Sequence, residues 1–545
     1  MTMTQVQAGA VGPDGLRIGL GTSATMPFGH AGIGDLVANL TLSGDRAALV
    51  DAAGTLTYAQ LADRLARASR GLQGLGIGPG AVVAASAANG NDLIIAFLAV
   101  QRLGALWAGV NRFLASPEQL AQLDLVRATH LLAEPSVIER LAAARADATW
   151  RNCSIGDPDS DFARIVAQAA PAPIGLPQVD VHAPAAIGFT SGTTGDPKAA
   201  VHSQHTMMTF VNGCLHGDLG GQWRPGLVRS HPIPLTILNG MIYGPMVALA
   251  SGGTFVSMDR TDAAGIADWI VRAGVQTINC TPTTVRDWLV KPELANVTLP
   301  SLEVVAVGAA PIEDTIRQVF LDRFGFEIVA DYGISESPCS MASSRPEHRP
   351  PENSVGQAHP FLRIAILDDE GASVANGEVG ELCAGPCEDG PWAGVYSAML
   401  GYLHAPAATR ATFHGAWLRT GDMARMDEAG NITIVGRRKE MILRGGANVY
   451  PAEVERVLNG HPAVAEAVVA SLPDARLGEV VAAWVLPKAK HEGGTRLRAD
   501  LQAYALARLA KYKVPERWFI VDDFPRNSMN KPQKERLRSL ACEPL

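Results

Sequence analysis

The sequence AAIGFTSGTTGDPK, residues 185–198, joins a short apolar run to a polar loop rich in glycine. The run at 185–189 predicts a buried strand. The loop that follows offers hydroxyl groups and backbone N–H groups that can wrap a polyphosphate, and a lysine adds positive charge at its end. These loop residues are Ser191, Gly192, Thr193, Thr194, Gly195 and Lys198. The stretch therefore predicts a phosphate-binding loop directly after a strand.

This loop differs from the Walker loop, which needs Gly-x-x-x-x-Gly-Lys-Ser/Thr at the start of a helix. No such string occurs in the sequence, and neither a Gly-x-Ser-x-Gly elbow nor a Gly-x-Gly-x-x-Gly motif after a strand is present. These absences disfavour P-loop NTPase, hydrolase and dehydrogenase chemistry.

Strand-like and helix-like segments alternate on both sides of the loop. Residues 48–61, ALVDAAGTLTYAQL, contain two apolar runs around a glycine turn, and Thr57 with Gln60 forms a capping-box pattern for a helix reaching Leu75. The run at 82–85 predicts a buried strand. Further apolar runs with strand character are AAIGFT, QTINC, EVVAVG and EIVADYG. This alternation predicts an α/β fold of layered, doubly wound parallel sheets, with ligands at the carboxyl ends of strands.

Two helix boundaries follow from single residues. Asn91 is predicted to cap an apolar helix that stops at Gly104.

The densest apolar run, 93–100, has eight residues, far fewer than the roughly 18 needed to cross a bilayer. We expect no transmembrane segment.

The pattern changes near residue 437 to shorter units. It predicts a helix over 451–458, a strand over 480–485, and a helix with Leu497, Leu501, Tyr504 and Leu509 near one face. From Arg438 onward there are 18 Lys and Arg against 13 Asp and Glu, a net charge of +5, whereas the preceding part has 28 against 41, or −13. This indicates a small basic α+β domain after a larger acidic one.

Composition narrows the function further. The 545 residues carry a net charge of −8, so no overall positive field favours nucleic acid. The seven cysteines are an odd number, which favours reduced thiols, and the first 29 residues lack a secretory signal pattern. We expect a cytoplasmic protein. The pair Cys383 and Cys387 has no second ligand pair nearby, so we expect no zinc there.

Beyond the loop, a series of motifs resembles the adenylate-forming superfamily, which includes acyl-CoA synthetases, nonribosomal peptide adenylation domains and firefly luciferase. The resemblance spans roughly 480 residues, from Leu56 to Lys534, in the family's order and spacing. Its motifs are TSGTTGDPK at 190–198, GAAP at 308–311, DYGISE at 331–336, SVGQ at 354–357, LGYLHAPAAT at 400–409, RTGD at 419–422, GRRKEMILRGGANVYPAEVE at 436–455 and NKPQK at 530–534. It implies a large adenylation domain over 1–437 and a small mobile α+β domain over 438–545.

The resemblance also implies two half-reactions: a carboxylic acid and ATP give an acyl-adenylate and pyrophosphate, and a thiol then displaces AMP. Expected cofactors are ATP, Mg²⁺ and coenzyme A. The implied catalytic residues are Thr190, Glu336 and Lys531, with Glu336 also holding Mg²⁺. In the DYGISE motif, Tyr332 is expected to stack on adenine and Ser335, where the family usually has Thr, to bond the α-phosphate. Asp331 and Gly333 complete the nucleotide contacts of this motif, and Ala309, Ala310 and Pro311 those of the GAAP loop.

Residues near the second domain receive roles by the same resemblance. Asp422 is expected to bind the ribose hydroxyls and Arg437 the ribose or a phosphate. Lys439 is the candidate hinge, and Gly445 and Gly446 are expected to approach the nucleotide and pantetheine after the domain rotates. Lys531 is the implied catalytic lysine because it aligns with the family's terminal lysine, although Asn530 replaces the usual glycine and Lys534 is a rival.

The acyl pocket is implied at Ile237, Leu238, Asn239 and Gly308. The aromatic-His pair that many relatives have near Thr236 and Ile237 is missing here. Ile237, Leu238 and Met241 would form an uncharged wall, which favours an apolar medium-chain fatty, alicyclic or aromatic acid. The predicted activity is an ATP-dependent acyl-CoA ligase. The alternative is a stand-alone enzyme that delivers the acyl group to a carrier-protein thiol. Expected partners are the acid, ATP and CoA, with a monomer or homodimer as the assembly.

Overall fold

The computed structural model describes residues 10–18, 25–170, 177–191, 197–216, 224–308, 312, 314–345, 350–488, 494–526 and 532–539. The chain divides into two compact units. Unit 1 comprises residues 1–365, 383–420 and 428–432, and unit 2 comprises residues 366–382, 421–427 and 433–545. Unit 2 thus includes three segments that precede residue 438, and the predicted domain boundary between 437 and 438 remains a prediction.

The first sheet of unit 1 has seven strands in the order β20-β10-β9-β6-β5-β7-β8. Strands β9, β6, β5, β7 and β8 pair in parallel, whereas β10 pairs antiparallel with β9 and β20. Their bounds are β5 Val82–Ser86, β6 Leu106–Gly109, β7 His130–Ala133, β8 Arg151–Ser154, β9 Pro184–Ser191, β10 Pro197–Ser203 and β20 Gly401–Tyr402. The predicted strand before the phosphate loop is therefore β9, and the loop lies between two antiparallel strands.

The second sheet has nine strands in the order β17-β16-β15-β14-β13-β11-β12-β3-β4. Its central strands are parallel and its edges antiparallel. The bounds are β3 Ala47–Asp51, β4 Gly54–Thr57, β11 Val228–Ser230, β12 Thr254–Val256, β13 Thr277–Cys280, β14 Val304–Val307, β15 Ile328–Ile334, β16 Ser337–Ser343 and β17 Gln357–Ala358. Together the two sheets confirm the predicted α/β class with layered parallel sheets.

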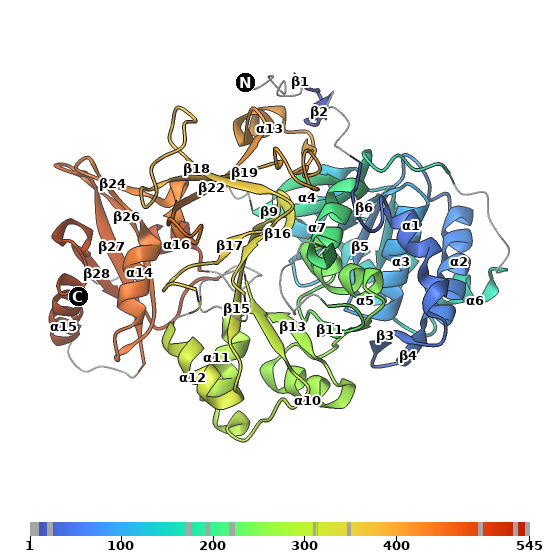
Figure 1. The fold of residues 1–545 in the computed structure, drawn as a ribbon, viewed down its shortest axis with the longest axis horizontal. Helices are drawn as coiled ribbons and strands as arrows, with labels where there is room; N and C mark the ends of the chain where they lie inside the picture. Colours follow the sequence, from blue (N-terminus) through green and yellow to red (C-terminus); the bar gives the residue numbers. More distant parts are fainter. Residues whose placement is uncertain are drawn as a thin grey trace. The chain divides into compact units, whose positions relative to one another are not determined.

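Helices of unit 1 cover these sheets (Figure 1), and α2 packs against both α3 and α6. Their bounds are α1 Ile33–Ala38, α2 Tyr58–Gly74, α3 Asn91–Arg102, α4 Ser116–Val126, α5 Pro135–Ala144, α6 Asp161–Gln168, α7 Gln204–His216, α8 Leu238–Met241, α9 Val247–Ala250, α10 Ala263–Ala273, α11 Pro282–Val290, α12 Asp314–Phe324 and α13 Pro406–Thr412. No helix in the described part of the chain is long and apolar enough to span a membrane.

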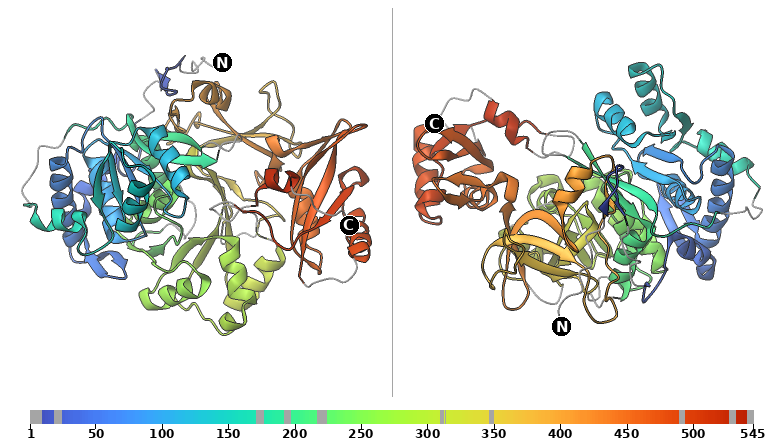
Figure 2. Two further views of the ribbon diagram at one scale, coloured as in Figure 1. Left: turned by 180° about the vertical axis from the view of Figure 1, so that it is seen from behind. Right: turned by 90° about the horizontal axis from the view of Figure 1, so that it is seen from above.

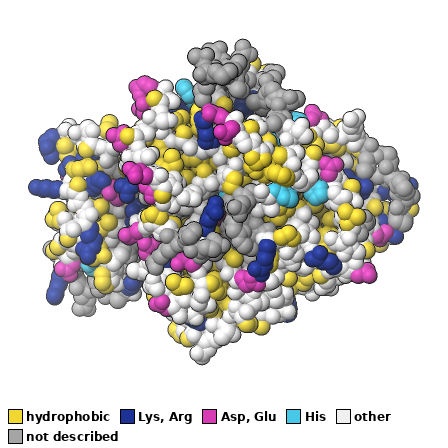
Figure 3. All heavy atoms as spheres, viewed as in Figure 1, with side chains coloured by type: hydrophobic (Ala, Val, Ile, Leu, Met, Phe, Trp, Pro, Cys, Tyr) yellow, Lys and Arg dark blue, Asp and Glu magenta, His cyan; other side chains and the backbone are white. Residues whose placement is uncertain are grey.

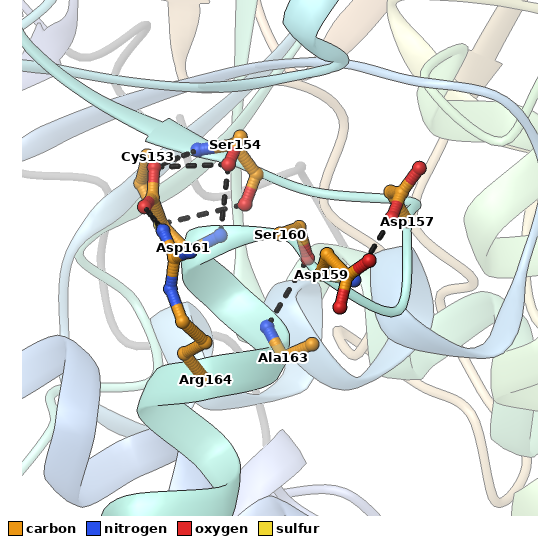
Figure 4. Close-up of polar contacts among 8 residues, drawn as sticks. All are labelled: Cys153, Ser154, Asp157, Asp159, Ser160, Asp161, Ala163 and Arg164. Atoms are coloured by element: carbon orange, nitrogen blue, oxygen red, sulfur yellow. Dashed lines mark hydrogen bonds and ion pairs between the residues drawn. The ribbon is translucent and has the colours of Figure 1, made fainter.

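Local capping explains where several helices begin. The predicted capping box of α2 is present, with the Thr57 side chain accepting from the Gln60 N–H. At α6 the Ser160 hydroxyl accepts from the Ala163 N–H at 3.2 Å, and Asp161 bonds Ser154 and Arg164 (Figure 4). The predicted Asn91 cap is wrong, because Gly90 is the cap residue of α3. The Asn91 N–H instead donates to Asp51 Oδ2 at 2.9 Å, so a distant carboxylate satisfies this helix start.

Unit 2 has a five-stranded sheet in the order β25-β24-β27-β26, with β28 paired to β27. The bounds are β24 Ile442–Arg444, β25 Ala447–Val449, β26 Val464–Asp474, β27 Gly478–Pro487, β28 Arg517–Ile520, α14 Pro451–Asn459, α15 Gly494–Leu506 and α16 Lys534–Ser539. The predicted helix at 451–458 and strand at 480–485 are confirmed as α14 and β27, whereas Leu509 lies beyond the end of α15.

Alternation along the long strands gives this sheet two apolar faces. Val481, Ala483 and Val485 pack with α14 and α15, while Ala482 and Trp484 pack with Leu537 of α16. The sheet is therefore covered by helices on both faces (Figure 2). Strands β18 Arg363–Leu367, β19 Gly380–Gly385 and β22 Trp417–Met426 each have residues in both units, and β21 Phe413–His414 and β23 Ile432–Arg437 complete their sheet.

Candidate active site

Three segments of unit 1 bring a lysine, a tyrosine and a glutamate together. Tyr402 on β20 donates its hydroxyl hydrogen bond to Glu336 Oε1, and Glu336 lies in the turn between β15 and β16. The Lys198 ammonium lies 5.1 Å from the centre of the Tyr402 ring. Strand β10 pairs Lys198 with Thr190 of β9, so both ends of the phosphate loop are fixed beside this cluster. The motif residues Thr190, Lys198 and Glu336 are thus on neighbouring elements.

The DYGISE turn is also anchored through its backbone. His202 Nε2 donates to the Ser335 carbonyl at 2.8 Å, and the Met399 N–H donates to the Glu336 carbonyl at 2.9 Å. Desolvation lowers the pKa of buried His202 to about 4, so the ring is neutral at pH 7. A neutral ring that donates from Nε2 holds the turn in place without adding charge next to Glu336.

Glu336 fits the expected magnesium site. Among the described residues, Tyr402 is the side-chain partner of its carboxylate, through Oε1. Mg²⁺ is commonly held by one or two protein carboxylates together with substrate phosphates and water. When bound, it would neutralise phosphate charge, and the Glu336 carboxylate would hold it. No group of three or more His, Cys, Asp and Glu side chains suited to a metal occurs in the described ranges.

Strand β15 carries the remaining motif residues. Asp331 accepts hydrogen bonds from Asn279 Nδ2 at 3.1 Å and from the Ser340 hydroxyl. Desolvation raises the pKa of Asp331 to about 6, and hydrogen bonds from Ser340, Asn279 and Tyr243 limit the rise. Tyr332 is half-buried, and Gly333 is required by space because a Cβ there would fall 2.1 Å from the Cys339 carbonyl oxygen.

The residues predicted to line the acyl pocket fall on two segments, one of which contacts β16 and the other β15. Ile237 precedes α8, Leu238 is buried within it, and the Asn239 carbonyl accepts from Cys339 Sγ at 3.9 Å. Gly308 follows β14, and a Cβ built there would lie 3.8 Å from Asp331 Oδ2. The sequence interpretation missed the polar partners Asn279, Tyr243, Ser340 and His359 in this region.

In unit 2, Asp422 and Arg437 form an ion pair in which Arg437 Nε lies 2.5 Å from Asp422 Oδ1. The Asp422 side chain is buried, whereas that of Arg437 is 46% exposed. The two predicted ribose contacts therefore meet each other across strands β22 and β23. Whether they bind ribose stays a prediction.

The glycine pair Gly445 and Gly446 forms the loop between β24 and β25, which pair Arg444 with Ala447. Their φ angles are +56° and +87°, as in the two-residue hairpin turns that favour glycine. This turn alone explains both glycines, and their approach to a ligand stays a prediction. Lys439 lies in the short helix η5 Arg438–Glu440. Its role as a hinge stays a prediction.

The rival catalytic lysine, Lys534, is engaged in ion pairs within unit 2. Its Nζ lies 2.7 Å from Glu440 and 3.0 Å from Glu455. Burial alone would lower the pKa of Lys534, but Glu455 and Glu440 outweigh it and raise the pKa. These contacts favour a structural role for Lys534.

Several predicted site residues lie outside the described residues. They are Gly192, Thr193, Thr194 and Gly195 of the phosphate loop, Ala309, Ala310 and Pro311 of the GAAP loop, and Lys531. The side chain of Ser191 belongs to the same group.

Comparison with known proteins identifies the family. The chain matches the family model described as AMP-binding enzyme over residues 37–402 and the AMP-binding enzyme C-terminal domain over residues 453–531. It is 31% identical over 497 residues to an indoleacetate–CoA ligase of Aromatoleum aromaticum, covering 89% of this chain and 93% of the relative. It is 30% identical over 493 residues to the fatty acid–[acyl-carrier-protein] ligase ScoC of Streptomyces coeruleorubidus, covering 89% and 91%.

A solved structure supports the same assignment. The ATP-bound crystal structure of MatB from Rhodopseudomonas palustris superposes with a TM-score of 0.82 at 26% identity, covering 93% of this chain and 98% of that one. Both the family and the fold indicated by the sequence motifs are confirmed. The chain therefore belongs to the AMP-binding enzyme family, in the acyl-CoA synthetase branch of the adenylate-forming superfamily, and is an acid–thiol ligase.

Proposed function

We propose that the enzyme activates a carboxylic acid with a largely apolar body and transfers it to coenzyme A. In the first half-reaction, a carboxylate oxygen attacks the α-phosphorus of ATP and pyrophosphate leaves. In the second, the CoA sulfur attacks the acyl carbon, the C–O bond to the adenylate breaks, and AMP is released. The observation that carries this proposal is the convergence of Lys198, Tyr402 and Glu336 at the ends of the phosphate loop.

Two of these groups, Lys198 and Glu336, suit tasks that the first half-reaction requires. The Lys198 ammonium offers positive charge where polyphosphate is expected, and the Glu336 carboxylate would hold Mg²⁺. Relatives support the acid class as well, because one is named for indoleacetate, an aromatic acid, and one for fatty acids. A cytoplasmic location is part of the proposal, since six described cysteines are free thiols and five of these are buried.

The test is a coupled assay for pyrophosphate, AMP and CoA consumption with a panel of linear, branched, cyclohexyl and benzoic acids. Release of pyrophosphate should require both an acid and ATP, and CoA should be consumed in step. Glu336→Gln should lower turnover by at least about 100-fold. Its matched control, Glu352→Gln at an exposed glutamate, should leave turnover unchanged. Absence of nucleotide turnover with every acid would refute the proposal.

The second candidate acceptor is a carrier-protein thiol, which the carrier-protein ligase among the relatives favours. Mass spectrometry decides between the two acceptors. An acyl mass shift on CoA supports the leading proposal, whereas a shift confined to the phosphopantetheine of a carrier protein supports the alternative.

A further inference from the structure

A group of polar side chains surrounds the Asp331 carboxylate in unit 1. We define the Asp331 cluster as Asp331, Asn279, Tyr243, Ser340 and His359. Asn279 Nδ2 lies 3.1 Å from Asp331 Oδ2, the Ser340 hydroxyl bonds Asp331 Oδ1, and the Tyr243 hydroxyl also bonds the carboxylate. Three segments distant in sequence therefore supply donors to one acceptor, and His359 from a fourth segment bonds Ser340.

The hydrogen-bond directions in the cluster are fixed by chemistry. An ionised carboxylate only accepts, so the Ser340 hydroxyl donates to Asp331 and is left to accept from His359 Nε2 at 2.7 Å. Burial lowers the pKa of His359 to about 3, so its ring is neutral and its Nδ1 is an acceptor. That Nδ1 atom is buried and has no hydrogen-bond partner among the described residues. The cluster therefore contains more acceptors than donors.

The carboxylate itself has room for another donor. A carboxylate offers about four lone-pair sites, and the donors Asn279, Ser340 and Tyr243 occupy three of them. No Lys, Arg or His in the described ranges forms an ion pair with Asp331. Asp331 keeps some exposed surface, whereas Ser340 and His359 are almost fully buried. A desolvated acceptor without a cation is costly unless a further donor reaches it.

A π-helical turn positions one side of the cluster. Residues 242–246 form the π-helix η3, which contains Tyr243 and Pro245. Proline has no N–H to donate along the helix, which favours the widened turn, and such turns occur frequently at functional sites. Tyr243 is thus held by an irregular element whose geometry an ordinary α-helix would not provide.

The cluster contacts both segments that carry the residues predicted for the acyl pocket. Tyr243 lies four residues after Asn239 of the first segment, and a Cβ built on Gly308 of the second segment would stand 3.8 Å from Asp331 Oδ2. Beside Asp331, Cys339 on β16 contacts the Asn239 carbonyl in the first segment. The segment that carries the predicted wall of Ile237, Leu238 and Met241 therefore also contacts, through Tyr243, a polar cluster that the sequence interpretation missed.

We propose that the Asp331 cluster determines acid specificity, with the Asp331 carboxylate accepting a hydrogen bond from an N–H or O–H group on the otherwise apolar body of the acid. This inference rests on the proposed function, and it names the substrate class more narrowly. Acids that lack a donor leave the fourth site of the carboxylate unpaired and are disfavoured for that reason.

The first test uses the wild-type enzyme and matched pairs of acids that differ in one donor. Suitable pairs are indole-3-acetate with benzothiophene-3-acetate, 4-hydroxycinnamate with cinnamate, and 3-aminobenzoate with benzoate. Adenylation is followed by AMP and pyrophosphate formation. In at least one pair, kcat/KM should be about 10-fold or more higher for the acid with the donor. Equal or better turnover of every donor-free acid overturns the inference and leaves the proposed function standing. If no acid is turned over, the proposed function itself fails.

The second test compares Asp331→Leu with the wild-type enzyme on the preferred pair. The ratio of kcat/KM values should fall to within about threefold of unity, because the acceptor is gone. Should this variant fail to fold, Asp331→Asn keeps the size of the side chain and should lower the ratio by about threefold or more. The matched control Asp322→Asn changes an exposed carboxylate on α12 and should keep the wild-type ratio.

A competing role for Asp331 is contact with the adenine amino group, because the residue belongs to the predicted nucleotide motif. In that case Asp331→Leu would raise KM for ATP and relax the preference for ATP over GTP, while the ratio between paired acids would stay unchanged. That result would overturn the inference.

Discussion

Tyr402 links two residues that the sequence interpretation treated separately. Its hydroxyl donates to Glu336 Oε1, and its ring faces the Lys198 ammonium. Tyr402→Phe removes the hydrogen bond while keeping the ring. Because hydrogen bonds to charged groups contribute about 1.5–3 kcal/mol, the Mg²⁺ concentration for half-maximal activity should rise at least about tenfold. Titration with MgCl₂ at saturating ATP measures this. The exposed Tyr512 gives the control, Tyr512→Phe, and an unchanged Mg²⁺ midpoint in Tyr402→Phe would refute the positioning role.

Asp331 gives a pH prediction whose sign follows from burial. Burial raises the pKa of Asp331 from 3.8 to about 6, so the folded state keeps the proton up to a higher pH than the unfolded state does. The free energy of unfolding of the wild type, compared with that of a variant with a non-titrating residue at position 331, is therefore highest below pH 4. It falls by about 3 kcal/mol in all as the pH rises from about 4 to 6. The melting temperature of Asp331→Asn minus that of the wild type should increase across this range and level off above it. Parallel pH profiles would contradict the shifted pKa.

Residues were predictable from the sequence where a local motif carried the information. Lys198 and Glu336 stand in motifs with recognisable spacing, and the structure places them on adjoining elements. Asn279, Ser340 and His359 stand in no such motif. Their partnership with Asp331 depends on sheet pairing and on a contact across 52 residues, which a single sequence does not encode locally.

Among the elements, the hairpin of β24 and β25 tests whether its glycines serve the backbone. Gly446 has φ +87°, and a Cβ there would meet no atom within 4 Å. Gly446→Ala should therefore destabilise unit 2 by about 1–2 kcal/mol through backbone strain alone. Gly446→Asn should cost less, since Asn tolerates positive φ. Thermal melting measures both variants. Equal melting of Ala, Asn and wild-type proteins, with CoA turnover reduced in the first two, would instead favour a ligand contact.

Element boundaries were predictable to the extent that short-range chemistry sets them. Thr57 and Gln60 lie three residues apart, and their capping box starts α2 as expected. The start of α3 depends on Asp51, 40 residues earlier, and so the local pattern misassigned the cap to Asn91. The π-helix around Pro245 has no simple hydrophobic period either.

For the molecule as a whole, composition separated a large acidic part from a small basic part, and charge is interspersed on the described face in Figure 3. Each unit has its own core, because apolar residues recur with strand and helix periods within it. The boundary between the units was harder to predict from the sequence. Residues 366–382 and 421–427 belong to unit 2 because they contact residues that are distant from them in the sequence.

We expect two lysines near the carboxyl end, Lys531 and Lys534, to have different roles, one in catalysis and the other in stability. Lys534 is bound by Glu440 and Glu455, so Lys534→Ala leaves two carboxylates without their cation and should lower the melting temperature by several degrees.

Lys531 is the proposed catalytic group. Lys531→Ala should lower pyrophosphate release at least about 100-fold by removing charge stabilisation from the first half-reaction. It should melt as the wild type does and still convert a supplied acyl-adenylate to the CoA thioester. The exposed Lys511 provides the control, Lys511→Ala. Selective loss of adenylation in Lys534→Ala, with normal turnover by Lys531→Ala, would reverse the assignment. The reason is that the lysine that stabilises the transition state of adenylation must affect this half-reaction and leave thioester formation unchanged.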